Sequence, residues 1–180
     1  RAQGCNALPL HGEQTTAEQD AALYSAEQRI VVATSIAESS LTVPGVRVVV
    51  DAGLARVPRR DAQRGMSGLV TVSTSKSSAD QRAGRAGRVD EGWAYRLWPE
   101  SRRLEQQRRA EITQTELAGL ALELAAWGQA ELRFLDPPPP GALAAARDLL
   151  RRLDALDAGG SLTAIGRRML ALGTHPRLAA

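Results

Sequence analysis

Runs of apolar residues mark the strands expected in the first half of the chain. Residues 29–33 and 46–50 are rich in valine and isoleucine without strict alternation, which is typical of strands buried in a parallel sheet. Shorter strands are expected at 7–10 and 93–97. A helix is expected at 16–27, between the strands at 7–10 and 29–33. Strands that alternate with helices predict an α/β fold, here a parallel sheet flanked by helices.

Residues 54–73 predict an antiparallel hairpin whose second strand returns into the sheet. Four arginines precede Gly65 and give the hairpin a basic tip: Arg56, Arg59, Arg60 and Arg64.

The pattern changes after Pro99. Residues 101–111 are strongly charged and predict a linker or an exposed helix. A capping box of Thr113 with Glu116 predicts a helix that Gly128 ends. The prolines at 137–140 predict an extended break between helices. Leucines between 143 and 156 predict a second, amphipathic helix. Thr163 is expected to cap a third helix that runs to Leu172. These short helices indicate a small, mostly helical domain of the winged-helix type. We expect two domains, 1–107 and 108–180.

Composition narrows the class of protein. A hydrophobic content of 43% with 24% charged residues is ordinary for a globular chain and argues against wholesale disorder. A single cysteine, Cys5, excludes an intrachain disulfide and a cysteine-based metal site. His11 and His175 lack ligand spacing, so structural roles are expected for both. No apolar stretch is long enough to span a bilayer and no signal peptide is visible, so a cytoplasmic location is expected. The chain begins at Arg1, and we expect it to be part of a longer protein.

The run from Gln81 to Arg88 carries the strongest chemical signal. Arg82, Arg85 and Arg88 recur at a spacing of three, and a glycine directly precedes the second and the third. A capping box of Ser78 with Gln81 predicts that a helix begins here. Arginines at i and i+3 on a helix present rigid guanidinium forks to one target, and such forks can bind a phosphate through two hydrogen bonds. A solvated basic helix end is the alternative interpretation.

Several segments in order resemble one known family. The arginine run is similar to motif VI of superfamily 2 helicases, and residues 33–42 resemble motif V in its DEAH-box form. As in that family, residues 45–50 and then 51–54 follow, and residues 9–12 resemble the motif IV region. Two further segments, 92–98 and 111–112, resemble the exit into a winged-helix domain. Two more, 127–128 and 175–179, resemble the bacterial HrpB-type branch.

The resemblance implies a second RecA-like domain followed by a winged helix, taken from an ATP-dependent RNA helicase. Arg85 and Arg88 would act as arginine fingers on ATP, Gln81 would orient the water or the phosphate, and Ser40 and Thr42 would lie toward the nucleotide. The sequence contains no phosphate loop and no acidic D-E-x-H motif, so ATP and its Mg²⁺ would be held by a first RecA-like domain that is missing here. That domain and a downstream helical domain are the expected partners, and the chain alone is expected to be unable to hydrolyse ATP.

The same resemblance places nucleic acid on motif V and the hairpin. Thr34 and Ser35 would contact a phosphate of single-stranded RNA, although a helix-capping role for Thr34 is an equal alternative. Arg59 and Arg60 would contact phosphates without reading bases, and solvated surface charge is the alternative for them. The residues themselves do not distinguish RNA from DNA.

Two other roles come from the residues around the arginine run and from the second domain. Arg82 is expected to form a structural ion pair, and Glu38 is expected to anchor the motif V loop. The winged helix is expected to be a packing hub, with duplex binding through Arg167 and Arg168 as the alternative. A non-catalytic nucleic-acid-binding module and a decayed scaffold are the competing functions, and the joint occurrence of motifs V and VI argues against both.

Overall fold

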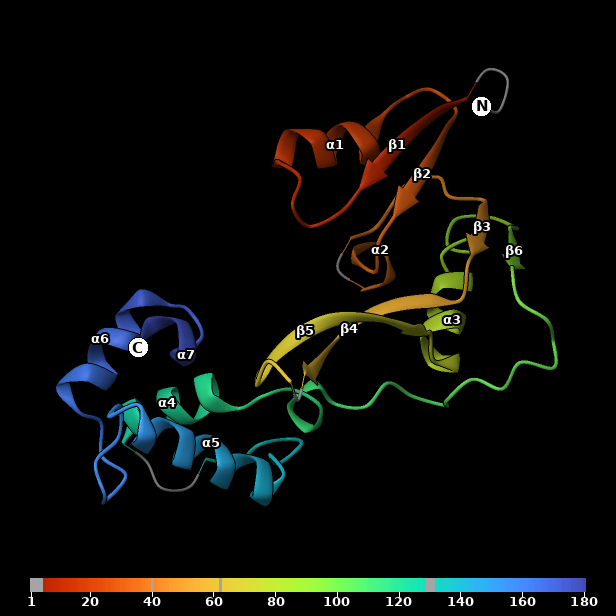
Figure 1. Ribbon diagram of the computed structural model, residues 1–180. Coiled ribbons are helices and arrows are strands. Elements are labelled where there is room, and N and C mark those ends of the chain that lie inside the picture. Colours follow the sequence, from red (N-terminus) through yellow and green to blue (C-terminus); the bar gives the residue numbers. More distant parts are fainter. Residues whose placement is uncertain (1–4, 40, 62, 129–131) are drawn as a thin grey trace. The chain divides into compact units, whose positions relative to one another are not determined.

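The computed structural model describes residues 5–39, 41–61, 63–128 and 132–180 of the 180-residue chain. The chain divides into two compact units (Figure 1). Unit 1 contains Arg1–Arg56 and Thr71–Arg108, and unit 2 contains Val57–Val70 and Arg109–Ala180. The outer half of the hairpin therefore belongs to unit 2, although its base belongs to unit 1.

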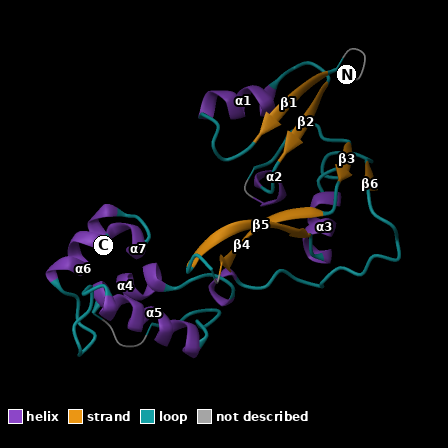
Figure 2. Cartoon of the chain, in the orientation of Figure 1, coloured by secondary structure: helices purple, strands orange, loops and turns teal. Residues whose placement is uncertain are grey.

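Unit 1 contains two pairs of parallel strands (Figure 2). β1 (Asn6–Leu10) pairs with β2 (Arg29–Ala33), and β3 (Val48–Asp51) pairs with β6 (Trp93–Arg96). The alternation of parallel strands with helices confirms the predicted α/β class. The pairs form separate two-stranded sheets rather than the predicted single sheet, because no described strand bonds to both β2 and β3.

Helix α1 (Thr16–Tyr24) packs on β1 and buries Ala22 and Leu23 against Leu10. Its N-terminus is a complete capping box. The Glu18 N–H bonds Thr15 Oγ1 at 3.4 Å, and the Glu18 carboxylate accepts the Thr15 N–H at 2.8 Å. The bond from the Thr15 backbone, followed by the bond from its hydroxyl, lowers the pKa of Glu18 below its usual range.

The predicted helix at 16–27 ends early because Arg29 caps it. The Arg29 guanidinium donates to the carbonyls of Ala22, Leu23 and Ser25 at 2.9, 2.5 and 2.5 Å. These bonds satisfy acceptors that the end of a helix leaves without an intrahelical partner. The first residue of β2 thus fixes the end of α1 at Tyr24.

The hairpin forms as predicted, with β4 (Leu54–Asp61) bonded to β5 (Met66–Ser73). Gly65 lies in the turn at a φ of 64°, a left-handed conformation that glycine adopts without strain. The prediction that the second strand returns into the parallel sheet is wrong. Among the described strands, β5 pairs with β4 alone.

Unit 2 is mostly helical, as predicted. In the described part of this unit, four α-helices follow a short 3₁₀ helix: η1 (Glu111–Thr113), α4 (Ala118–Trp127), α5 (Pro140–Arg152), α6 (Ala164–Leu172) and α7 (Pro176–Ala179). Gly128 ends α4 at a φ of 74°, and Thr163 caps α6, both as predicted. The proline block breaks the chain only as far as Pro139, because Pro140 is the first residue of α5, where a missing N–H costs nothing.

The predicted capping box of Thr113 with Glu116 does not form. The Thr113 hydroxyl donates to the Ala110 carbonyl, and α4 begins later, where the Glu116 carboxylate accepts the Ala118 N–H at 2.9 Å. The Glu116 carboxylate, three residues after Thr113, therefore takes the place of the predicted threonine cap.

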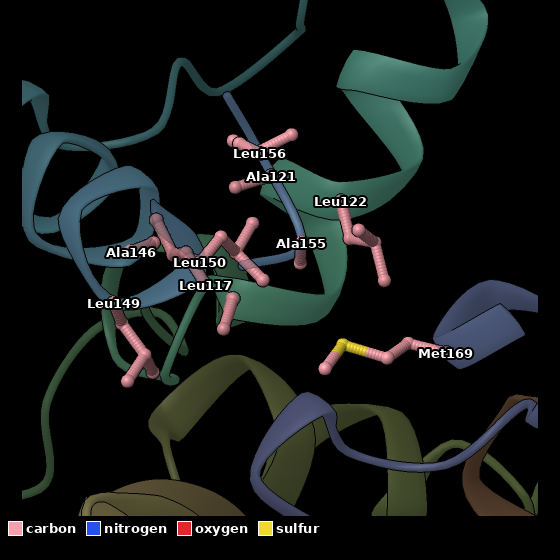
Figure 3. Close-up of a cluster of buried hydrophobic side chains, with 10 residues drawn as sticks. Leu117, Ala121, Leu122, Ala146, Leu149, Leu150, Ala155, Leu156 and Met169 are labelled. Atoms are coloured by element: carbon pink, nitrogen blue, oxygen red, sulfur yellow. The ribbon is translucent and has the colours of Figure 1, made fainter. Parts of the chain in front are cut away.

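An apolar core lies between the helices of unit 2 (Figure 3). Its ten buried residues come from α4, α5, α6 and the segments that flank them, and Figure 3 shows Met169 of α6 pointing toward the leucines of α5. Leu150 and Ala118 are completely buried. Within the described part of the chain, none of the helices is both long enough and apolar enough to cross a membrane.

Candidate functional site

The arginine run begins in α3 (Lys76–Ala83) and continues beyond it. α3 starts at Lys76 because Ser75 Oγ accepts the Ser78 N–H at 3.2 Å. The predicted capping box of Ser78 with Gln81 is therefore wrong, since an earlier serine caps the helix nearly one turn upstream.

A distant segment completes this N-terminus. The carbonyls of Glu105 and Gln106 accept the N–H groups of Lys76 and Ser77 at 2.8 and 3.1 Å. Residues 101–111 were predicted as a linker or an exposed helix. Residues 101–110 contain no helix, η1 begins at Glu111, and part of this segment supplies acceptors to α3.

α3 ends at Ala83, so that Arg85 and Arg88 lie in the turns after the helix rather than on it. The Arg85 N–H bonds the Arg82 carbonyl at 3.1 Å, a tighter spacing than the helical one. The predicted side-by-side arrangement on one helix face is thus wrong. Each of the three arginines instead reaches a different set of acceptors.

Arg82 is largely buried, with 17% of its side chain exposed. Its Nε donates to Glu38 Oε2 at 3.1 Å, and its Nη1 donates to Asp51 Oδ1 at 2.9 Å and to the Leu54 carbonyl at 3.0 Å. The expected structural ion pair of Arg82 is confirmed, and Arg82 pairs with two carboxylates, Glu38 and Asp51. Arg82 therefore ties α2 (Ile36–Ser39) to the end of β3 and to the start of the hairpin.

Arg85 bonds to backbone rather than to a carboxylate. Its Nε donates to the Glu38 carbonyl at 3.1 Å, its Nη2 donates to the same carbonyl, and its Nη1 donates to the Leu41 carbonyl at 3.3 Å. A guanidinium carries five N–H donors, so two remain after these three bonds. The carbonyls orient the fork and leave part of it able to bind an anion.

Arg88 is exposed, and to the described residues its side chain makes one hydrogen bond, from Nη1 to Thr42 Oγ1 at 3.0 Å. Arg82, Arg85 and Arg88 thus converge on the segment between Glu38 and Thr42. Gln81 is exposed on α3, and its side chain bonds to no described residue. Ser40 lies outside the described residues.

Thr34 and Ser35 lie where β2 ends and α2 begins. The Thr34 N–H bonds the Leu10 carbonyl at 3.0 Å, and the Glu38 N–H bonds the Ser35 carbonyl at 3.0 Å. Both side chains are exposed, and neither hydroxyl bonds to a described residue. Among the described residues, therefore, no hydrogen bond of the Thr34 hydroxyl supports the alternative capping role. This is the carboxyl end of a parallel strand, where open α/β sheets bind ligands.

The hairpin arginines belong to both units, with Arg56 in unit 1 and Arg59, Arg60 and Arg64 in unit 2. Arg59 and Arg60 are exposed neighbours on β4, and successive strand residues face opposite sides. One strand of nucleic acid on a single face of the hairpin would therefore contact only one of them. Arg64 instead lies 3.6 Å from Asp61, with Nε facing Oδ2.

Sequence reasoning did not assign a role to Asp51. It is buried, and its Oδ1 accepts both the Gly53 N–H and Arg82, each at 2.9 Å. Its sequence signals are a carboxylate directly at the end of an apolar strand and its place at the start of residues 51–54, which follow motif V as in the family. Glu38 anchors the motif V loop as expected, and its Oε1 also lies 3.8 Å from Arg108.

The site suits an anion more than a metal. Guanidinium donors at Arg85 and Arg88 remain available, and charged donors of this kind bind phosphate oxygens strongly. Among the residues that the structure describes, no three His, Cys, Asp or Glu side chains are grouped so as to hold a metal ion.

Comparison with known families agrees with this geometry. Residues 1–90 match the helicase conserved C-terminal domain, and residues 146–173 match the winged helix of the helicase associated domain (HA2). The ATP-dependent RNA helicase HrpB of Escherichia coli is 43% identical over 96% of this chain and 22% of its own length. The probable ATP-dependent RNA helicase DHX35 homolog of Caenorhabditis elegans is 38% identical over 87% of this chain and 22% of its own length.

Solved structures give the same result. A crystal structure of the E. coli DEAH/RHA helicase HrpB is 42% identical with a TM-score of 0.85, covering 97% of this chain and 23% of that one. A crystal structure of the E. coli DExH-box NTPase HrpB is 40% identical with a TM-score of 0.81, covering 98% and 23%. The chain therefore spans about a fifth of the length of the relatives that it matches.

Proposed function

We propose that this chain, which belongs to the HrpB-type branch of the DEAH-box helicases, supplies the second RecA-like domain and the winged helix of an ATP-dependent RNA helicase. The observation that carries the proposal is the convergence of the motif VI arginines on the motif V loop, at the carboxyl end of β2. We place the domain boundary between 107 and 108, and the compact unit that starts again at Arg109 supports this place.

On the nucleotide side, Arg85 and Arg88 stabilise the charge that develops on the transferring phosphoryl group of ATP. The carbonyls of Glu38 and Leu41 hold the Arg85 fork before the nucleotide arrives, which lowers the cost of orienting it. Arg88 exchanges its bond to Thr42 for the phosphate, and Gln81 orients the attacking water. We also propose, on the resemblance to the family, that Ser40 and Thr42 lie toward the nucleotide.

ATP supplies the phosphoanhydride bond that is cleaved, and the remaining binding groups lie outside this sequence. We propose that a first RecA-like domain of the same protein holds ATP and Mg²⁺, and that a downstream helical domain packs on the winged helix. A cytoplasmic location is proposed on the resemblance to a bacterial RNA helicase.

On the nucleic-acid side, Thr34 and Ser35 bind a phosphate of single-stranded RNA through their hydroxyls and neighbouring N–H groups, and Arg59 and Arg60 add charge. Ser35 directly precedes α2, and the Glu38 carbonyl that holds Arg85 belongs to that helix. A strand bound at Thr34 therefore acts directly on the loop that orients the fingers, which couples RNA to hydrolysis.

The winged helix serves as a packing hub. Its α-helices already share a closed apolar core, and Arg167 of the alternative recognition helix bonds the Leu162 carbonyl at 3.2 Å instead of presenting all its donors. A hub needs a stable body with exposed helix faces, which unit 2 has.

The test is ATP hydrolysis by the full-length protein with and without single-stranded RNA, beside Arg88→Ala and the control Arg147→Ala on α5. Hydrolysis that RNA stimulates, that falls about a thousandfold in Arg88→Ala and that is unchanged in Arg147→Ala supports the proposal. RNA binding without any hydrolysis would instead favour a non-catalytic binding module.

A further inference from the structure

A pocket of about 80 Å³ lies within unit 2, between the hairpin turn, the start of α4 and one face of α5. Three guanidinium groups line it, from Arg60 on β4, Arg152 on α5 and Arg177 on α7. Its volume corresponds to a few water molecules or one tetrahedral oxyanion. One face of α5 adds a small, apolar wall, and the hairpin turn and the start of α4 complete the lining with Gly65, Thr115, Glu116 and Leu117.

The one carboxylate in the lining is already satisfied. Glu116 is largely buried, accepts the Ala118 N–H at 2.9 Å and bonds His175 Nε2 at 2.8 Å through its Oε2. His175 Nδ1 accepts the Arg177 N–H, so Nε2 carries the hydrogen that bonds Glu116. The guanidinium charges therefore outnumber the carboxylate charge in the pocket, and the excess is positive.

Arg177 is held in place by the hairpin turn. Its Nε donates to the Gly65 carbonyl at 3.2 Å, which leaves the Nη donors unused by this bond. A Cβ added at Gly65 would lie 2.9 Å from Arg177 Nη2, so only glycine lets the guanidinium approach this closely. Arg60 and Arg152 are exposed, and among the described residues neither side chain has a hydrogen-bond or ion-pair partner.

We propose that this pocket binds one backbone phosphate of a nucleic-acid strand. Arg177 provides an oriented fork, and Arg60 and Arg152 close on the phosphate from the other sides. Arg152 and Arg177 thus become nucleic-acid contacts that neither motif V nor motif VI contains. Arg60 faces the pocket and its neighbour Arg59 faces the opposite side of the hairpin, so only Arg60 belongs to this site.

A strand fits the observations better than a free anion does. Arg60 and Arg152 are exposed at the pocket, so a phosphate bound there stays connected to the rest of a polyanionic strand, whereas Arg59 faces the other side of the hairpin and Arg64 lies 3.6 Å from Asp61. The proposal rests on the proposed function in that the strand is single-stranded RNA. It is independent of the nucleotide-facing arginines, which lie in unit 1.

The experiment measures the affinity of the full-length protein for a fluorescein-labelled single-stranded RNA by anisotropy over a series of KCl concentrations. The variants are Arg152→Gln, Arg177→Gln and the double variant, with Arg147→Gln on the same helix as the matched control. Each single variant is expected to weaken binding several-fold and to lower the salt slope by up to about 0.7. The double variant is expected to lose less than the sum, because both side chains grip one phosphate.

Arg152→Gln decides the outcome, because Arg177 also bonds the hairpin and its loss can loosen the fold. Unchanged RNA affinity and salt slope in Arg152→Gln and in the double variant would overturn the proposal that the pocket binds a phosphate. The proposed helicase function would still stand if Arg88→Ala abolished ATP hydrolysis. A second outcome is that inorganic phosphate raises the melting temperature of the parent but not of Arg152→Gln, while RNA binding is the same in both. This outcome would show that the pocket binds a free anion and would overturn the proposal that it binds a nucleic-acid strand. A parent protein that binds no RNA at any salt concentration would overturn the pocket and the function together.

Discussion

Each of the two units of this chain is stabilised internally by a different kind of interaction. Among the described residues, ten buried apolar side chains form the core of unit 2, whereas the core beneath α1 in unit 1 has three: Leu10, Ala22 and Leu23. The strands of unit 1 leave large apolar side chains in solvent, with Val32 63% and Val50 61% exposed. Where unit 1 carries its chemistry, a network of arginine contacts connects the segments. The difference shows that the site is part of what holds unit 1 together, whereas unit 2 is held by its core.

Removing a core leucine is the strongest test of this difference. Leu150 and Leu10 are both fully buried, but Leu150 lies in the larger cluster. Leu150→Ala is expected to cost about 3 kcal/mol, because a dense core cannot collapse around the cavity, whereas Leu10→Ala is expected to cost about 2 kcal/mol. Hydrogen exchange followed by mass spectrometry resolves each unit separately, which a single melting curve of two units does not.

In the full-length protein, Leu150→Ala should speed exchange in α4 and α5 and leave β1 and β2 unchanged. Equal costs for the two substitutions would show that the small cluster packs as densely as the large one, and the contrast between the units would be lost.

Arg82→Gln tests the polar half of the comparison. Glutamine keeps a hydrogen-bonding group but removes the charge that pairs with Glu38 and Asp51, two largely buried carboxylates. A buried charge that loses its partner is destabilising, and with part of Arg82 exposed we expect about 2 kcal/mol. The measurement is hydrogen exchange in α2 and β3, where the loss should concentrate.

Arg96→Gln is the matched control for Arg82→Gln. Arg96 pairs with Asp80 at 2.6 Å, but the two side chains are 44% and 52% exposed. Exposed pairs contribute less than about 1 kcal/mol, so exchange should barely change. If both substitutions had the same effect, burial of the arginine network would not matter to unit 1.

The same contrast explains which features could be predicted from the sequence. The cap of α6 by Thr163 and the end of α4 at Gly128 depend on neighbouring residues, so a local pattern was sufficient for both. The end of α1 depends on Arg29, and the start of α3 depends on Ser75 and on carbonyls from residues 105 and 106, so the predicted boundaries there were wrong. The partners of Arg82 lie 44 and 31 positions away, and only their chemical type was predictable.

The smallest expected effect compares the two threonine caps. Thr163 accepts the Gly166 N–H at 3.0 Å and donates to the Asp154 carbonyl at 2.6 Å, so Thr163→Ala is expected to cost about 1 kcal/mol in unit 2 at any pH. Thr15→Ala also removes the hydroxyl bond that helps to lower the pKa of Glu18. A carboxyl whose pKa is lowered in the folded state stabilises the fold above its unfolded pKa, and this contribution is lost as the pH falls through the folded pKa. The effect of Thr15→Ala on exchange in α1 should therefore shrink in acid while that of Thr163→Ala on α6 stays constant. A Thr15→Ala effect that did not change with pH would show that Glu18 contributes nothing to the cap of α1.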